Sequence, residues 1–86
     1  MRVLIPTPLR SYTGGRAEVE GAGASLAALL EHLNAGSPGM RFRMIDEQNR
    51  IRQHIRIFVN GEQVHDLSHQ LAHGDEVQII CALSGG

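Results

Sequence analysis

The segment SLAALLEHLNAG, residues 25–36, carries four leucines at Leu26, Leu29, Leu30 and Leu33. This i, i+3, i+4, i+7 spacing places all four side chains on one face of a helix. Ser25 can cap the start of that helix with its hydroxyl oxygen, and the run Gly-Ser-Pro-Gly at 36–39 ends it. The sequence therefore predicts an amphipathic helix whose leucine face is buried against another layer of structure.

Two strands are predicted before this helix. Residues 3–5 form an apolar run that is expected to reach Pro6 or a little beyond, and residues 16–20 alternate charged and apolar side chains. Gly14-Gly15 supplies a turn between the two segments. We therefore expect the two segments to pair as a hairpin.

Three further strands are predicted after the helix. Residues 55–59 alternate in the same way and lead into Asn60-Gly61, the strongest two-residue hairpin signal in a sequence. Residues 63–66 then form a short returning strand, and residues 76–81 form the last strand. With one main helix, these segments predict an α+β domain over residues 1–81, with the helix on one face of a mixed sheet of four or five strands.

The remaining segments are predicted to be short or irregular. Met40 and Met44 suit a brief helical turn within residues 40–54, which are otherwise read as irregular. Residues 67–71 are expected to form a single helical turn that places two leucines in the core. Residues 73–75 form a turn before the last strand.

Composition limits the classes of function. The chain of 86 residues forms one small domain with little room for a deep catalytic cleft. Its eight basic residues are all arginine, and nine acids give a formal charge of -1, without the basic excess that nucleic-acid binding usually needs. The single cysteine excludes an internal disulfide, and the apolar run before Pro6 is too short for a signal peptide or a spanning helix. We therefore expect a cytoplasmic protein that binds neither nucleic acid nor membrane.

The chain finishes in Gly85-Gly86, shortly after the last predicted strand. Two residues without side chains place the terminal carboxylate on a narrow thread that can enter a tight active site. The five residues after Cys81 span at most about 17–18 Å. A terminal Gly-Gly alone is a weak sign of function, but its position after a closing strand strengthens it.

With these features the whole chain resembles the ubiquitin-like sulfur carriers, which include the molybdopterin synthase small subunit and the thiamin-biosynthesis sulfur carrier. The segments that carry the resemblance are Val3 to Arg10, Thr13-Gly14-Gly15, Ser25 to Leu33, Phe58 to Glu62, Gly74 to Val77 and Gly85-Gly86. It is most similar to the carriers of cysteine and thio-metabolite pathways, through Ile5-Pro6-Thr7, the insert Pro38 to His54 and the ending Ala82 to Gly86. The resemblance implies a β-grasp (ubiquitin-like) fold, its last strand parallel to the first, with a flexible C-terminal tail over residues 82–86.

The resemblance also implies a function carried by the tail residues Leu83, Ser84, Gly85 and Gly86. The chain would itself be no enzyme and would bind no cofactor or metal. An ATP-dependent adenylyltransferase similar to ubiquitin-activating enzymes would convert the Gly86 carboxylate to an acyl-adenylate, which receives sulfur as a thiocarboxylate. A biosynthetic enzyme would then accept the sulfur for cysteine, homocysteine, a thio-metabolite, molybdopterin or thiamin. For some carriers in this group, a metalloprotease is implied that exposes the glycine pair.

The expected partner interface consists of Phe58, Ile80 and Leu83. Phe58 and Ile80 fall out of phase with the core positions of their strands, so they are predicted to point onto the open face of the sheet. Exposed apolar side chains mark interaction sites. In the family that the chain resembles, the open face and the tail dock the adenylating enzyme.

Other residues with chemical potential are assigned structural roles. His65, His69 and His73 are four apart but fall in different predicted elements, which favours solvated histidines over a zinc site. Cys81 is in phase with the core positions of the last strand, which favours a packed residue over a reactive thiol. Five of the eight arginines lie within residues 41–56. They form either a solvated edge that hinders aggregation or a docking patch for an acidic partner.

Two functions of other classes stay open at this point. The chain could be a protein modifier whose Gly86 is joined to lysines on targets, or a passive β-grasp interaction module. Because the chain contains no lysine, it cannot form conjugates linked through its own side chains. Modification of other proteins remains compatible with the sequence.

Overall fold

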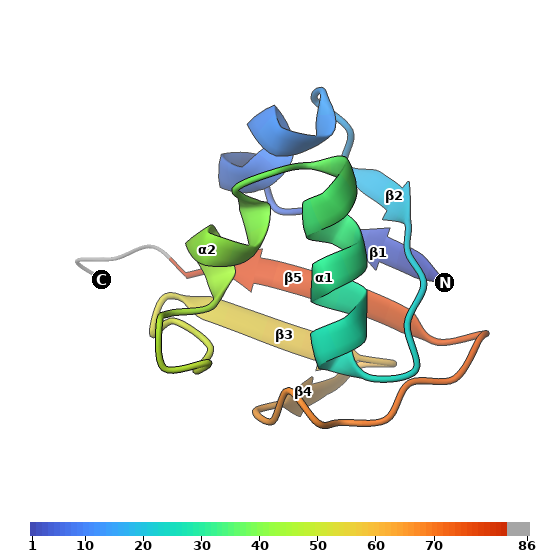
Figure 1. The fold of residues 1–86 in the computed structure, drawn as a ribbon. Coiled ribbons are helices and arrows are strands. Elements are labelled where there is room, and N and C mark those ends of the chain that lie inside the picture. Colours follow the sequence, from blue (N-terminus) through green and yellow to red (C-terminus); the bar gives the residue numbers. More distant parts are fainter. Residues whose placement is uncertain (83–86) are drawn as a thin grey trace.

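The computed structural model describes residues 1–82. Its elements, in chain order, are β1 (Arg2–Leu4), η1 (Thr7–Thr13), β2 (Glu18–Glu20), α1 (Leu26–Gly36), α2 (Met40–Met44), β3 (Ile55–Val59), β4 (Glu62–Val64) and β5 (Glu76–Cys81) (Figure 1). The strands form a five-stranded sheet in the order β2-β1-β5-β3-β4. Both hairpins predicted from the sequence are present, because β1 pairs with β2 and β3 with β4, each antiparallel.

The last strand lies at the centre of the sheet. β5 runs parallel to β1, with Val77 opposite Val3, and antiparallel to β3, with Ile79 opposite Ile57. This arrangement confirms the predicted β-grasp fold and its parallel pairing of the first and last strands. β1 pairs with the first half of β5 as far as Gln78, and β3 pairs with β5 as far as Cys81, so the end of β5 is held by β3.

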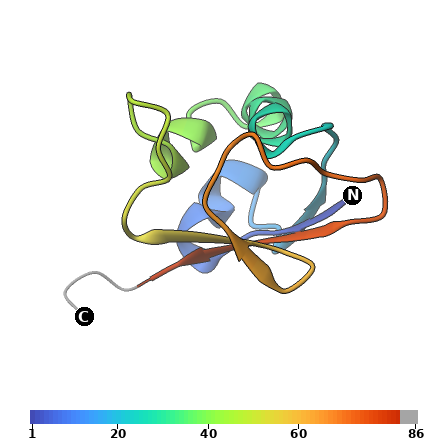
Figure 2. The same ribbon diagram turned by 90° about the horizontal axis from the view of Figure 1, so that it is seen from below.

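The helices α1 and α2 cover one face of the sheet, and the other face is open (Figure 2). The four leucines of α1 pack on the covered face together with alternate residues of the strands. The buried core consists of Val3, Ile5, Leu9, Leu26, Leu29, Leu30, Leu33, Met40, Met44, Ile45, Ile55, Ile57, Val59, Val64, Val77 and Ile79. No helix within residues 1–82 is long and apolar enough to cross a bilayer.

The start of α1 is capped as predicted. The Oγ of Ser25 accepts a hydrogen bond from the N–H of Ala28 at 3.2 Å. The first two helical N–H groups, of Leu26 and Ala27, donate to the carbonyl oxygens of His69 and Leu67. These bonds satisfy donors that a helix leaves free at its N-terminus.

These same bonds explain why the helical turn predicted over residues 67–71 is wrong. The segment forms a turn in which the N–H of His69 donates to the Asp66 carbonyl, followed by an isolated bridge between Gln70 and Ser25. Two carbonyl groups of this segment accept hydrogen bonds from the first turn of α1 and not from N–H groups within the segment. Leu67 and Leu71 nevertheless pack against the core, as expected.

The prediction that the first strand reaches Pro6 is also wrong, because β1 ends at Leu4. The two prolines begin the 3-10 helix η1 instead, with Pro6 at its N-cap and Pro8 in its first turn. Proline suits the first turn of a helix because the N–H that it lacks has no partner there. η1 buries Leu9 and ends at Gly14, which adopts the left-handed conformation at φ 65°.

The remaining short elements agree with the sequence. α2 spans the predicted helical turn at Met40–Met44, and both methionines are buried. Asn60 and Gly61 have φ values of 51° and 86°, as the two-residue hairpin turn requires. The returning strand is Glu62–Val64, one residue earlier than predicted and two residues shorter at its end.

Candidate functional site

The end of β5 is fixed to the neighbouring strand up to the start of the predicted tail. Cys81 lies opposite Ile55 of β3, and the N–H of Ala82 donates to the His54 carbonyl at 2.7 Å. The predicted tail residues Leu83, Ser84, Gly85 and Gly86 lie outside the described residues. We refer to Cys81 and Ala82, where the described chain ends, as the tail root.

Phe58 and Ile80 lie on the open face of the sheet, as predicted. Their strands bury the alternate residues on the other face, and both side chains are half-buried rather than fully exposed. Phe58 is opposite Gln78 in the sheet, and Ile80 is two residues further along β5. Their role as interface residues stays a prediction.

Leu4 joins these residues on the open face, which the sequence reasoning missed. It lies opposite Gln78 on the other side of β5, so Leu4, Phe58 and Ile80 surround this glutamine. A shallow hollow lined by Leu4, Gln78 and Ile80 continues to the tail root. The alternation of Val3, Leu4 and Ile5 indicates that Leu4 points away from the core. Only the parallel register of β1 and β5 shows that Leu4 lies opposite Gln78. We call Leu4, Phe58 and Ile80 the open-face patch.

Cys81 has the packed position that its phase in the strand predicted. It is half-buried and contacts the core cluster. Burial raises the pKa of its thiol above the ordinary value for cysteine, and the positive charge of Arg43 partly opposes this shift. The thiol is therefore protonated and poorly nucleophilic near neutral pH.

The histidines show no arrangement for a metal. His65 and His69 line one small hollow together with Asp66 and Asp75. Within the described part of the chain, no three His, Cys, Asp or Glu side chains gather closely enough to hold an ion.

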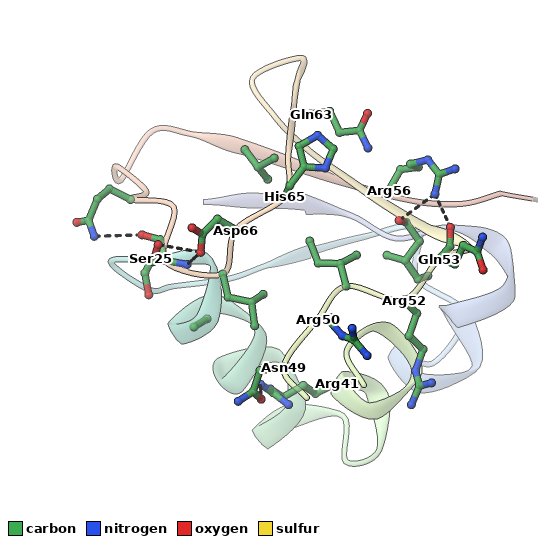
Figure 3. Close-up of a pocket in the computed structure, with 17 residues that line it drawn as sticks. Ser25, Arg41, Asn49, Arg50, Arg52, Gln53, Arg56, Gln63, His65 and Asp66 are labelled. Carbon is green, nitrogen blue, oxygen red and sulfur yellow. Dashed lines mark hydrogen bonds between the residues drawn. The ribbon is translucent and has the colours of Figure 1, made fainter. Parts of the chain in front are cut away.

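A groove of about 1350 Å³ lies between the 49–56 segment, the start of α1 and residues 63–70 (Figure 3). Four of the clustered arginines line it: Arg41, Arg50, Arg52 and Arg56. Arg41 Nε lies 3.1 Å from Glu31 Oε1, though poorly aligned for a hydrogen bond, and Arg50 Nε lies 3.5 Å from Asp46 Oδ2. The groove is polar and open, and two of its four positive charges are paired within the molecule.

The described surface thus offers docking features around the tail root rather than a catalytic constellation. The open-face patch and several arginines lie next to the end of β5. The Asp66 carboxylate in the groove accepts hydrogen bonds from the N–H and the hydroxyl of Ser68. Hydrogen bonds from Ser68 lower the pKa of this carboxyl, so Asp66 is ionised and unsuited to act as a general acid at neutral pH.

Comparison with known proteins gives a consistent result over the full length. The model of the ThiS family matches residues 3–86. The sulfur carrier protein CysO of Mycobacterium bovis and that of Mycobacterium tuberculosis are each 36% identical to this chain over 89 residues, covering 98% of this chain and 96% of theirs.

Solved structures agree with these sequence matches. The crystal structure of Mycobacterium tuberculosis CysO matches with a TM-score of 0.90 at 34% identity, covering 95% of this chain and 98% of that one. The structure of the Amycolatopsis orientalis BexX/CysO complex gives 0.91 at 32% identity over 99% and 98% of the two chains. SAMP1 from Haloferax volcanii gives 0.78 at 27% identity over 100% and 98%. The chain therefore belongs to the ThiS family of ubiquitin-like sulfur carriers.

Proposed function

We propose that this carrier holds sulfur as a thiocarboxylate on Gly86, after an ATP-dependent partner enzyme has adenylated that carboxylate. The observation that carries the proposal is the match of the ThiS family through residue 86, together with the full-length similarity to CysO sulfur carriers. Gly85-Gly86 then follows a central strand whose end is paired with β3. Members of this family carry sulfur rather than catalyse its transfer, which agrees with the expectation that the chain is no enzyme.

The proposed chemistry needs activation because a carboxylate is a poor electrophile. Attack of a Gly86 carboxylate oxygen on the α-phosphorus of ATP releases pyrophosphate and leaves an acyl-adenylate. Hydrosulfide supplied by the partner system then attacks the acyl carbon, AMP departs with the electron pair of the broken C–O bond, and loss of the S–H proton leaves the thiocarboxylate. The carrier supplies the acyl group and its position, while ATP and the acid-base groups belong to the partner.

The sulfur is proposed to pass to a biosynthetic enzyme that forms cysteine, homocysteine or a thio-metabolite. Support comes from the CysO relatives and from the structure in which a CysO is bound to BexX. For this chain, we infer that both the activating and the accepting enzyme dock at the open-face patch and the tail. A metalloprotease that exposes the glycine pair remains part of the proposal.

Intact-mass measurement after incubation with the cognate activating enzyme, ATP and a sulfur source tests this function. We expect a gain of about 16 Da, because sulfur replaces one carboxylate oxygen. Deletion of Gly86 should abolish the gain while the unfolding curve stays the same. Attachment of the chain to target lysines without a stable thiocarboxylate would instead support the modifier function suggested by the fold of SAMP1.

The open-face patch is tested by the variant Phe58→Asp. It should raise the KM of the activating enzyme for the carrier at least tenfold, because a charge in an apolar contact must be desolvated without a partner. Gln63→Asp is the matched control, since Gln63 lies opposite Phe58 on β4 and is already polar and exposed. Equal KM values for Phe58→Asp and the wild type would remove the patch from the interface.

A further inference from the structure

The five clustered arginines divide into two groups by their ionic partners. Arg41 and Arg50 are paired with Glu31 and Asp46. None of the five ion pairs found in residues 1–82 includes Arg43, Arg52 or Arg56. The guanidinium groups of these three side chains therefore form no ion pair within the described chain, although Glu47 lines a hollow with Arg43 and Arg52, and the charge of Arg52 acts on the Asp46 carboxylate.

Two of these three arginines are held in place by neutral groups. Arg52 Nε donates to the Phe42 carbonyl at 2.7 Å, and its guanidinium carbon lies 4.6 Å from the centroid of the Phe42 ring. Arg56 Nη1 donates to the carbonyl oxygens of Gln53 and Ile55. Side chains fixed in this way lose less conformational freedom when a partner binds. The charges are thus pre-positioned as well as unpaired.

Phe42 adds an apolar contact to this positive surface. Its side chain is 57% exposed, and it is the one large hydrophobic residue of the described chain in the exposed class. Phe42, Arg43 and Arg52 line a common hollow with His54 and one acidic residue, Glu47. Arginines beside an exposed aromatic ring have the composition of a binding hot spot. We call Phe42, Arg43, Arg52 and Arg56 the tail-root patch.

The tail-root patch adjoins the last described residues of β5. The His54 carbonyl in the same hollow accepts the hydrogen bond from Ala82, and Arg56 lies opposite Ile80 in the sheet. Arg43 is near enough to Cys81 to act electrostatically on its thiol. Through Arg56 the tail-root patch continues into the open-face patch. A protein that receives the tail must therefore approach both surfaces.

Positive and negative charges are distributed unevenly between residues 40–56 and the rest of the chain. Residues 40–56 contain five arginines and two acids, a net charge of +3, and the remaining residues contain three arginines and seven acids, a net charge of -4, which together give the total of -1. Glu20, Glu62 and Glu76 lie at the end of the sheet where β5 begins, opposite the tail root. Such a separation orients a protein as it approaches a charged partner.

We propose that the tail-root patch docks onto an acidic surface of the enzyme that adenylates Gly86, beside the entrance through which the tail passes. This inference rests on the proposed function. The unpaired guanidinium groups bind carboxylates of the partner, and Phe42 fills an apolar contact between them. Arg41 and Arg50 contribute little, because Glu31 and Asp46 already compensate them.

The test measures initial rates of thiocarboxylate formation by intact mass at several carrier concentrations, with the cognate activating enzyme. The triple variant Arg43→Gln/Arg52→Gln/Arg56→Gln should raise KM about tenfold at low ionic strength and change kcat less than about twofold. The KM of the wild type should rise with added salt, and that of the triple variant should be nearly constant. Arg43→Gln alone, which removes no hydrogen bond found in the structure, should show part of the same effect even if the triple variant is poorly folded.

Arg16→Gln is the matched control. Arg16 is exposed and without an ion pair in the described chain, but it precedes β2 at the opposite edge of the sheet. Its KM and salt dependence should equal those of the wild type.

The outcomes distinguish this proposal from the function on which it rests. No mass gain in the wild type contradicts the sulfur-carrier function itself. A normal gain with equal, salt-independent KM values in wild type and variants overturns the docking proposal alone. If the wild type dimerises at low salt in sedimentation velocity, the triple variant stays monomeric and KM is unchanged, the patch instead binds the acidic end of a second copy and the proposal is wrong.

Discussion

Asn60 joins the β3-β4 hairpin to the start of β5. Its replacement should separate the contribution of its side-chain hydrogen bonds to stability from that of its backbone conformation. Its backbone has a φ of 51°, in the left-handed region. Its side chain donates from Nδ2 to Asp75 Oδ1 at 2.9 Å and accepts at Oδ1 from the N–H of Glu76 at 3.0 Å. Asn60→Gly keeps the turn and loses both hydrogen bonds, whereas Asn60→Ala loses the bonds and strains the backbone.

The expected losses follow from these contacts. Two exposed hydrogen bonds contribute together about 1 kcal/mol, at the low end of the usual range. A non-glycine residue without a polar side chain adds about 1 kcal/mol in the left-handed region. We therefore expect Asn60→Gly to lower the free energy of unfolding by about 1 kcal/mol and Asn60→Ala by about 2 kcal/mol. Domains of this size are stable by only about 4–13 kcal/mol, so both changes are measurable.

Urea unfolding followed by circular dichroism measures both variants against the wild type. With a slope of about 1 kcal/mol per molar urea, the midpoint should fall by about 1 M for Asn60→Gly and about 2 M for Asn60→Ala. Sulfur loading of the folded variants should equal that of the wild type, because Asn60 is at the end of the sheet opposite the tail root. A midpoint for Asn60→Ala equal to or above that for Asn60→Gly would refute the reasoning about the turn.

Three further changes test other parts of the structure. Asp75→Asn addresses a carboxyl whose pKa is lowered below its ordinary range, first by the N–H of Ala72 and then by Asn60. The carboxylate therefore stabilises the fold above the pKa of the unfolded chain and stops doing so as pH falls through the lowered pKa, so the urea midpoints of variant and wild type should differ at neutral pH and converge in strong acid. Cys81→Ser should load sulfur normally, and wild-type Cys81 should react with iodoacetamide at neutral pH more slowly than free cysteine, because burial raises its pKa. Leu30→Ala empties a fully buried position of the core and should lower the free energy of unfolding by about 2–5 kcal/mol in urea titrations.

The parts of the fold that the sequence predicted correctly are those with local signals. The leucine spacing of α1 and the Asn60-Gly61 turn depend only on residues that are close in the chain. The errors occurred where partners far along the chain decide the structure. Residues 67–71 are a turn because α1 uses their carbonyl groups, and no spacing within that segment reveals this. η1 was missed because Pro6 and Pro8 were read as the end of a strand rather than as the first turn of a helix.

For the candidate site too, local sequence signals predicted some features, and contacts between distant residues determine the others. The alternation of β3 and β5 predicted the orientation of Phe58 and Ile80, but Leu4 needed the parallel register of β1 and β5. The sequence located the arginine cluster, but it did not show which of the arginines form ion pairs. Which arginines keep an unpaired charge depends on contacts such as that of Arg41 with Glu31 on α1. Only the folded structure shows that the unpaired arginines lie at the tail root.

The central position of β5 bears on how the proposed sulfur carrier would present Gly86 to a partner's active site. β5 is paired on both sides, and the Ala82 N–H is still bonded to His54, so only residues 83–86 follow the last described contact. Four residues span at most about 13–14 Å. With so short a tether, the place that Gly86 can reach is determined by how the domain docks. Under the proposed function, contacts at the tail root and the open-face patch would therefore act on the chemistry by positioning the acyl carbon.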